Sequence, residues 1–283
     1  MHVRKAINDL LRHTGYQIAK TSGSQASLSL VPGQVLDTDL IASRVAATRK
    51  HVWIVAPPKS GSTWLTALLD RLLEWPLVPL VNGYDRREQE VDLLSMLRFP
   101  DINILSPHQH CRASQPTIDF IKKFRVRPIL ITRNIFDSMV SFRDHLLNES
   151  RAVPMAYVDD RFFELDEDKQ YEFVIEMFLP WFLSYYASWF SAEGLAPADR
   201  LLVSYEELVA DTSKTLHRTL EYIGEARSDS EIQTTIARVQ TMDTRKNKAV
   251  HGRGAQSLKE HHQERIRDLG RYYSHIDLSM IGL

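Results

Sequence analysis

Short apolar runs alternate with segments of helical periodicity through most of the chain after residue 50. The runs His51–Ala56, Pro128–Thr132 and Leu201–Ser204 are short, apolar and rich in β-branched residues. Each is followed by a stretch whose apolar residues recur at helical spacing. This alternation predicts an α/β fold of three layers, in which a central parallel β-sheet is flanked by helices on both faces.

Further elements follow from the same periodicities. A brief strand is expected at Ile102–Leu105. Pro180 lies inside a long aromatic helix and predicts a break or a kink there, because proline removes one backbone hydrogen bond. The predicted helices are Trp64–Leu73, Gln89–Leu97, Ile135–Leu147, Lys169–Glu193 and several short ones within residues 206–242.

The first 50 residues read as an appendage to this domain. Residues 3–19 have apolar side chains on one side and basic side chains opposite or flanking them, which predicts an amphipathic helix. Such a helix docks on its own domain or on a partner subunit, with a membrane surface as the alternative. Residues 21–34 are rich in Ser, Gly and Gln and read as a linker. We therefore expect a helix and linker over 1–50 and one domain over 51–283.

Composition restricts the functional classes. The 283 residues hold 35 Lys and Arg against 36 Asp and Glu, so the net charge of −1 gives no overall attraction to nucleic acid. Cys111 is the only cysteine, which excludes an intrachain disulfide. No transmembrane segment or signal peptide is evident, and a soluble, cytoplasmic protein is expected.

The run Pro58–Trp64 (PKSGSTW) predicts an anion-binding turn between a strand and a helix. Gly61 lets the backbone approach an anion, and the helix that follows presents its first N–H groups and its positive dipole end. The order differs from the G-x-x-x-x-G-K-[ST] loop of nucleoside triphosphatases, because Lys59 precedes the glycine. A sulfuryl group carries less charge than a terminal phosphate, so a lysine and amide donors suffice without a metal ion.

The same run resembles the phosphosulfate loop of the sulfotransferase family, Pro-Lys-Ser-Gly-(Ser/Thr)-Thr-Trp, without a gap. The resemblance implies a domain that uses 3′-phosphoadenosine 5′-phosphosulfate (PAPS). It implies that Trp64 stacks near the adenine and that the 5′-phosphosulfate is held by Lys59, Ser60, Gly61, Ser62 and Thr63.

A second resemblance follows the strand Pro128–Thr132. Arg133 at its carboxyl end offers a planar fork suited to phosphate. The family's 3′-phosphate string, Arg-Asn-x-x-Asp-x-x-x-Ser, is matched by Arg133, Asn134, Asp137 and Ser141. Tyr205 begins a Tyr-Glu-Glu-Leu run similar to the family element whose tyrosine approaches the nucleotide, although a buried core tyrosine fits the same run.

The family's closing loop, Arg-Lys-Gly-x-x-Gly, is matched only in part. Lys248 and Gly252 agree with it, whereas its arginine and first glycine are missing. Residues 244–256 are still basic, so one of several cations there, Arg253 among them, is expected to contact the 3′-phosphate. A solvated basic loop without a ligand is the alternative.

A histidine suits the role of general base near neutral pH. The resemblance places that base about two dozen residues before the phosphate arginine, which fits His108 and His110, and His110 is preferred. The flanking residues differ from the family's Lys-Thr-His-(Leu/Pro) string. A metal site at His108, His110 and Cys111 is disfavoured because no further ligand completes it, and no metal is expected.

Together these features predict in-line transfer of a sulfuryl group from PAPS to an acceptor hydroxyl or amine, with His110 as base and Lys59 stabilising the leaving phosphate. The alternatives are a P-loop kinase using ATP and Mg²⁺, and a nucleotide-binding module without catalysis. The acceptor stays open: a small molecule, a carbohydrate, a lipid-linked or a carrier-bound group. A homo-oligomer is possible on this sequence.

Overall fold

The computed structural model describes residues 49–80, 91, 102–153, 155–242 and 252–283, and the backbone alone of residues 17–20, 26–29 and His108. The predicted helix Gln89–Leu97 lies outside this part, apart from Val91. No helix within it is long and apolar enough to cross a membrane.

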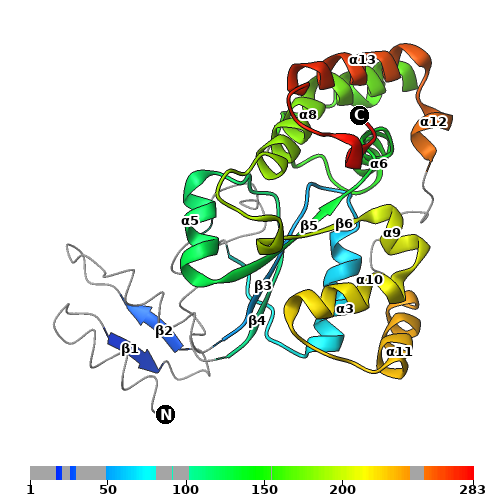
Figure 1. Cartoon of the computed structure of the whole chain (residues 1–283). Helices are drawn as coiled ribbons and strands as arrows, with labels where there is room; N and C mark the ends of the chain where they lie inside the picture. Colours follow the sequence, from blue (N-terminus) through cyan, green and yellow to red (C-terminus); the bar gives the residue numbers. More distant parts are fainter. Residues whose placement is uncertain are drawn as a thin grey trace.

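A four-stranded parallel sheet forms the centre of the molecule (Figure 1). Its strands lie in the order β4-β3-β5-β6, and the pairs His51↔Ile104, His51↔Val126 and Ile129↔Leu201 fix the register. All the carboxyl ends therefore meet at one edge. The bounds are His51–Val55 for β3, Ile104–Gln109 for β4, Val126–Thr132 for β5 and Leu201–Ser204 for β6.

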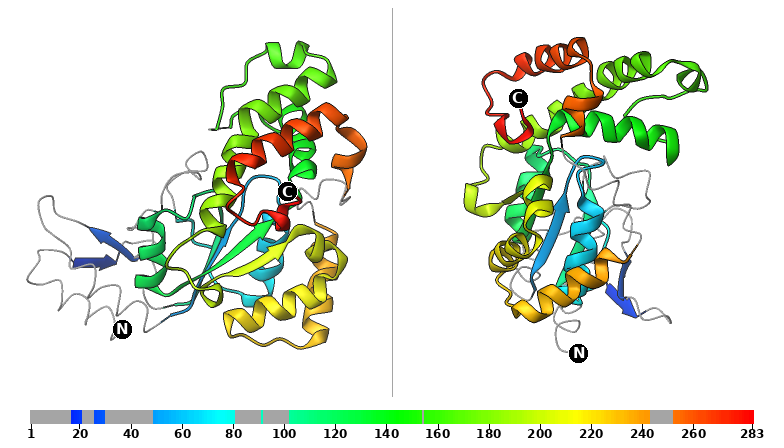
Figure 2. Two further views of the ribbon diagram at one scale, coloured as in Figure 1. Left: turned by 45° about the horizontal axis from the view of Figure 1, so that its top comes forward. Right: turned by 90° about the vertical axis from the view of Figure 1, so that its right-hand side faces the viewer.

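Helices cover both faces of this sheet, as the two views of Figure 2 show. Successive strand residues alternate between the faces: Trp53 and Val55 pack with α5, α6 and α8, whereas Val52 and Ile54 pack with α3, α10 and α11. The predicted three-layer α/β fold is confirmed. The helices are α3 Ser62–Leu73, α5 Gln115–Phe124, α6 Ile135–Asn148, α7 Arg161–Glu164, α8 Glu167–Phe190, α9 Tyr205–Ala210, α10 Thr212–Ile223, α11 Asp229–Gln240, α12 Arg253–Ser257 and α13 Glu260–Gly270, with single 3₁₀ turns at Pro197–Asp199, Arg271–Tyr273 and Ser279–Ile281.

The strand predicted at Ile102–Leu105 begins later and extends further, as β4. Trp53 pairs with Ser106 and Val55 with Gln109, so β4 uses one extra residue over this stretch and bulges. Pro107 lies in the bulge of this outermost strand, where a missing N–H is tolerated. His108 thus lies within the strand, and His110 follows its end directly.

Two other predictions need correction. Residues 17–20 (β1) and 26–29 (β2) form an antiparallel pair. The predicted helix 3–19 is therefore wrong at residues 17–19, and the predicted linker contains a strand. Residues 3–16 lie outside the described part. The pairing gives both segments a shared ladder of hydrogen bonds that a helix and a linker would lack. A break at Pro180, one of the two predicted outcomes, is also wrong, because α8 continues through it, whereas a kink there stays a prediction. Pro180 is exposed, so solvent can reach the carbonyl that loses its partner.

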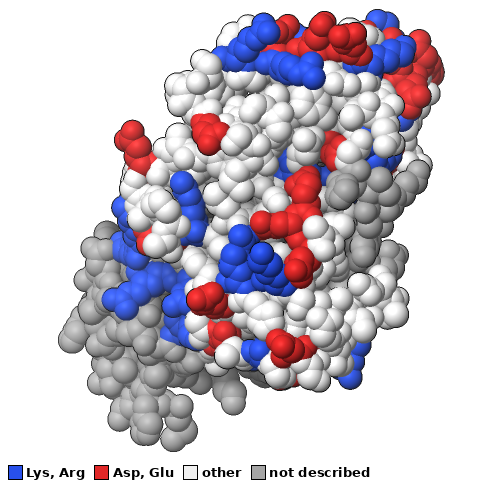
Figure 3. Space-filling view, turned by 45° about the vertical axis from the view of Figure 1, so that its right-hand side comes forward, with Lys and Arg blue, Asp and Glu red and all other residues white. Residues whose placement is uncertain are grey.

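The C-terminal segment folds back over α8. Helix α13 lies against α8 in Figure 1, and Arg265 bonds Glu176 across the two helices at 2.6 Å and 3.0 Å. Basic and acidic side chains alternate over this end of the molecule (Figure 3). The segment is therefore fastened by buried apolar side chains, among them Ile266 and Ile281, which join the main core cluster, and by polar contacts on its outer side.

Replacing Trp53 by Ala tests the packing beneath the sheet. Its fully buried ring meets Phe120 and Trp189 edge-on, with centroids 6.2 Å and 6.1 Å away. Trp53→Ala should lower the free energy of unfolding by about 3–5 kcal/mol, the range for large cavities in cores. Denaturant titration measures it, with the 84% exposed Tyr157→Ala as control. A loss no larger than that of the control would contradict this packing.

Candidate functional site

The turn between β3 and α3 presents the amino end of α3 at the carboxyl edge of the sheet. Gly61 is the N-cap of α3 and has a left-handed backbone with φ 87°, and no side chain caps the helix. Lys59 also has a positive φ, 64°, which is uncommon for a residue with a Cβ and occurs at functional sites. Ser60 and Ser62 are buried, whereas Thr63 is exposed. The turn therefore leaves the start of α3 without a side-chain cap, at the place where the sequence predicts an anion.

Tyr205 joins this turn to the neighbouring strands. It is the first residue of α9, after β6, and its ring occupies the space beside Gly61: a Cβ on Gly61 would lie 2.5 Å from Tyr205 Cδ2. The guanidinium of Arg133, after β5, lies 4.4 Å from the centre of the same ring. Arg133 Nη1 also donates to the carbonyl oxygen of Lys59 at 2.6 Å. Lys59, Gly61, Arg133 and Tyr205 thus form one contiguous group.

Arg133 is buried at the centre of this group, with 4% of its surface exposed. Burial lowers the pKa of its guanidinium, and Tyr205 and Asp137 act in the opposite direction. Its Nε has no hydrogen-bond partner among the described residues. A buried guanidinium with a donor to spare favours an anion beside it.

Helix α6 follows Arg133 and anchors the start of α12. Asn134 caps α6 through hydrogen bonds from Phe136 N and Asp137 N at 3.0 Å and 3.3 Å. The Asp137 carboxylate accepts from Gly252 N at 2.7 Å and from Gly254 N at 2.6 Å. The C-terminal loop is therefore held to α6 through its backbone amides.

Two further residues of the predicted 3′-phosphate site lie on α6 or against it. Ser141 is fully buried on α6. Arg253 Nη2 donates to Asp144 Oδ2 at 2.7 Å, so its guanidinium is paired with α6. Lys248 lies outside the described residues.

Lys59 is paired with a residue that the sequence prediction did not include. Its Nζ lies 2.5 Å from Glu149 Oε1, just after α6, and Glu149 Oε2 also contacts His145 Nδ1 at 3.0 Å. Burial acts to raise the pKa of the Glu149 carboxyl, but hydrogen bonds from Lys59 and His145 outweigh it and hold the pKa below its ordinary value. The Glu149 carboxylate is thus the ion-pair partner of Lys59, the cation that the resemblance assigns to the phosphosulfate.

His110 lies beside the start of the same turn. Its Nδ1 is 2.5 Å from the carbonyl oxygen of Ala56, the residue between β3 and the turn, and its ring meets Trp181 edge-on. A carbonyl accepts only, so Nδ1 carries the proton and Nε2 carries the lone pair in the neutral ring. The side chain of His108 is outside the described part, so its position relative to the turn is open.

The structure therefore brings together predicted residues from the four segments that follow β3, β4, β5 and β6, and it adds residues such as Glu149 that were not predicted. Trp64 is 4% exposed and packs with Ile54 and Leu68 beneath the sheet, so its predicted contact with adenine stays a prediction. Sequence reasoning had no signal for Glu149 and quoted Asp137 only as part of a motif. Among the residues that were not predicted, Gly254 has the clearest sequence signal, because it is a second glycine two positions after Gly252 in a basic loop.

Replacing Gly254 by Ala tests the anchoring of the C-terminal loop. An added Cβ would lie 2.4 Å from Phe136 Cβ and 2.9 Å from Asp137 N, both part of α6. Gly254→Ala should therefore push the loop away and speed amide hydrogen exchange over residues 252–258 by about tenfold or more, as local opening becomes easier. The exposed neighbour Gln256→Ala is the control. Unchanged exchange in Gly254→Ala would refute the anchoring.

Comparisons with known proteins agree with this geometry. The sulfotransferase domain family profile matches residues 49–281. The crystal structure of mouse sulfotransferase SULT7A1 complexed with PAP is 17% identical, covers 85% of this chain and 91% of its own, and has a TM-score of 0.59. Retinol dehydratase in complex with androsterone and inactive cofactor PAP is 12% identical, with coverages of 93% and 98% and a TM-score of 0.56. No curated protein sequence matches.

At such identities the two structures show the shared fold alone. The family profile spans both the turn at Lys59 and the loop at Gly252, and with them all four strands of the parallel sheet. On that match, this chain belongs to the sulfotransferase family.

Proposed function

We propose that the chain transfers a sulfuryl group from PAPS to an acceptor hydroxyl or amine, with His110 as the base and Lys59 stabilising the leaving group. The observation that carries the proposal is the contiguity of the two cationic residues: Arg133 donates to the Lys59 carbonyl over the face of Tyr205. A molecule with phosphate groups at both ends of one nucleoside needs two cation sites joined in this way.

The residues fit such a donor. The turn supplies Lys59, Ser60, Gly61, Ser62 and Thr63 for its 5′-phosphosulfate, at the amino end of α3. The spare Nε of the buried Arg133 is directed to the 3′-phosphate. The further 3′-phosphate contacts in this proposal are Ser141, Tyr205, Lys248, Gly252 and Arg253, with Trp64 toward the adenine.

The chemistry follows from the two polar groups beside the turn. His110 Nε2 takes the acceptor proton while the acceptor oxygen or nitrogen forms its bond to sulfur. The bond from sulfur to the bridging oxygen of the 5′-phosphate breaks at the same time, and adenosine 3′,5′-bisphosphate (PAP) leaves with the electron pair. The Lys59 ammonium neutralises the charge that grows on that oxygen. His110 then loses its proton to solvent.

Lys59 must exchange partners for this role. Glu149 holds it in the structure described here, and an incoming phosphosulfate competes with that carboxylate for the same ammonium. The exchange replaces one anion by another, so the net electrostatic gain at this lysine is smaller than for an unpaired one. The pair with His145 gives Glu149 a second partner when Lys59 turns away.

Transfer of labelled sulfate from PAPS to a panel of hydroxyl and amine acceptors is the direct test of the activity. Calorimetry of PAP against ATP with Mg²⁺ separates a PAPS enzyme from a kinase. Binding of PAP without transfer to any acceptor would leave a nucleotide-binding module, and preference for ATP with Mg²⁺ would overturn the proposal.

Replacing His110 by Ala tests the base. Turnover should fall about 10²–10⁴-fold, the usual contribution of a positioned base, while the Kd for PAP stays within about twofold. Steady-state kinetics and calorimetry measure the two quantities, with His108→Ala as the matched variant. If His108→Ala loses turnover and His110→Ala keeps it, the base is His108.

Replacing Glu149 by Gln tests the competition for Lys59. Removal of the competing charge should tighten PAP binding about two- to fivefold, the range for a partly exposed ion pair worth up to about 1 kcal/mol. Calorimetry at fixed ionic strength measures it, with the exposed Glu221→Gln as a control of equal charge change. Weaker PAP binding in Glu149→Gln would show that the carboxylate assists the site.

A further inference from the structure

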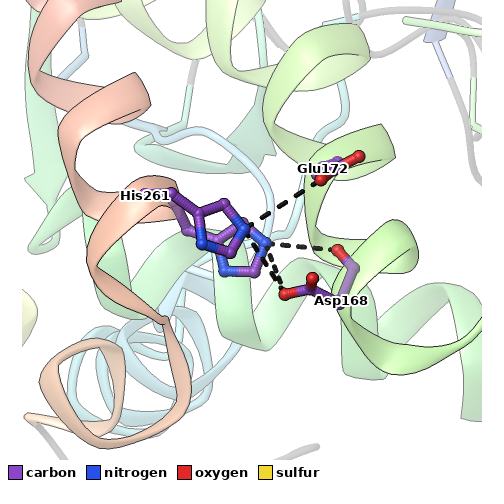
Figure 4. A group of neighbouring side chains, drawn as sticks. Asp168, Glu172 and His261 are labelled. Atoms are coloured by element: carbon purple, nitrogen blue, oxygen red, sulfur yellow. Dashed lines mark hydrogen bonds and ion pairs between the residues drawn. The ribbon is translucent and has the colours of Figure 1, made fainter.

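Four metal-ligating side chains meet where α8 and α13 pack together, and none of them belongs to the site described above. Asp168 and Glu172 lie one turn apart at the start of α8, and His261 and His262 lie in the first turn of α13. Figure 4 shows the His261 ring facing both carboxylates across the helix interface. One nitrogen or oxygen from each of the four residues lies within 4.8 Å of the others.

The separations suit a small tetrahedral ion. Asp168 Oδ1 lies 3.4 Å from His261 Nε2 and 3.3 Å from His262 Nε2, and His261 Nε2 lies 4.0 Å from Glu172 Oε1. Ligands bound to Zn²⁺ at about 2.0–2.2 Å in a tetrahedron are about 3.3–3.6 Å apart. Asp168 Oδ1 therefore already stands at ligand spacing from both histidine nitrogens, and the Glu172 oxygen lies within 4.8 Å of the other three ligand atoms.

One member of the group, His262, is buried. Its side chain is 2% exposed, and its Nε2 lies 3.3 Å from Asp168 Oδ1 and 3.2 Å from the Asp168 carbonyl oxygen, so this nitrogen exchanges the carbonyl for the ion when it binds one. Asp168 Oδ1 is also buried and makes no hydrogen bond of good geometry, although the nitrogens of Lys259, His261 and His262 surround it. Buried polar atoms are normally satisfied, so this carboxylate oxygen indicates a further ligand.

We propose that Asp168, Glu172, His261 and His262 form a structural Zn²⁺ site that fastens α13 to α8. Two carboxylates balance the charge of the ion, and two imidazoles with two carboxylate oxygens are donors that zinc accepts. Four protein ligands close the coordination sphere, which is typical of structural and not of catalytic zinc. The site is separate from the residues that take part in sulfuryl transfer.

Two lysines form ion pairs with the carboxylates of this group. Lys259 Nζ lies 2.9 Å from Asp168 Oδ1, and Lys169 Nζ lies 2.7 Å from Glu172 Oε2. Their side chains are 64% and 56% exposed, so both can turn into solvent. Lys259 therefore distinguishes two interpretations of the group. In an ion-pair network it stabilises the cluster, whereas in a metal site it competes with the metal ion for Asp168.

Zinc titration of the chelator-treated full-length protein tests the site. Calorimetry should give one tight equivalent of Zn²⁺, and bound Co²⁺ should show the intense visible absorption of tetrahedral coordination. His261→Ala should weaken binding at least tenfold, and Zn²⁺ should raise the Tm of the wild type but not of this variant. Lys259→Ala should tighten binding severalfold. The exposed His275→Ala is the control and should match the wild type.

The variants also exclude trivial outcomes. His261 is half-exposed, so its replacement should leave the fold intact, and far-UV circular dichroism checks this. Asp168→Asn is a second ligand variant and should likewise lose the ion. Equal affinity in the wild type, His261→Ala and Asp168→Asn would mean that zinc binds elsewhere, and the proposal would fail. It would also fail if Lys259→Ala bound zinc no more tightly than the wild type, because the cluster would then be an ion-pair network.

Discussion

The candidate site depends on one packing contact, in which the Tyr205 ring lies directly against Gly61. No other residue fits beside that ring, because a Cβ at position 61 would overlap it. The Arg133 guanidinium also contacts this ring, and it donates a hydrogen bond to the Lys59 carbonyl oxygen. Since β3, β5 and β6 are neighbours in the sheet, this contact joins three strand ends. The relative position of the two cations is therefore set by the fold before any anion binds.

What the sequence revealed was local, and what it missed was either irregular or distant. The turn at Lys59 and the strand before Arg133 were predictable because each is a short apolar run with its polar residues directly after it. Strand β4 was misplaced because Pro107 and its bulge interrupt the alternation of the strand. The partners of Asp137 lie more than a hundred residues away, at Gly252 and Gly254, and no spacing rule connects them.

Electrostatics at the turn are arranged locally in a chain that is almost neutral overall. Lys59 forms an ion pair with Glu149, whose carboxyl pKa is held below its ordinary value by hydrogen bonds, so the carboxylate is ionised at neutral pH. Arg133 is buried and meets an aromatic face and a carbonyl, both of which leave its charge intact. In the proposed function, an anion that enters the site therefore competes with a carboxylate at Lys59 and meets an unsatisfied donor at Arg133.

Helix α6 holds two parts of the proposed donor site, one near each of its ends. The first turn of α6 holds the loop through Asp137, and Glu149 just beyond its end holds Lys59, so the two ends of the proposed donor site share one rigid element. The Asp137 contacts are made to backbone N–H groups, which every residue except proline supplies. Placement of residues 252–254 therefore depends on the glycine at 254, which permits the close approach to α6.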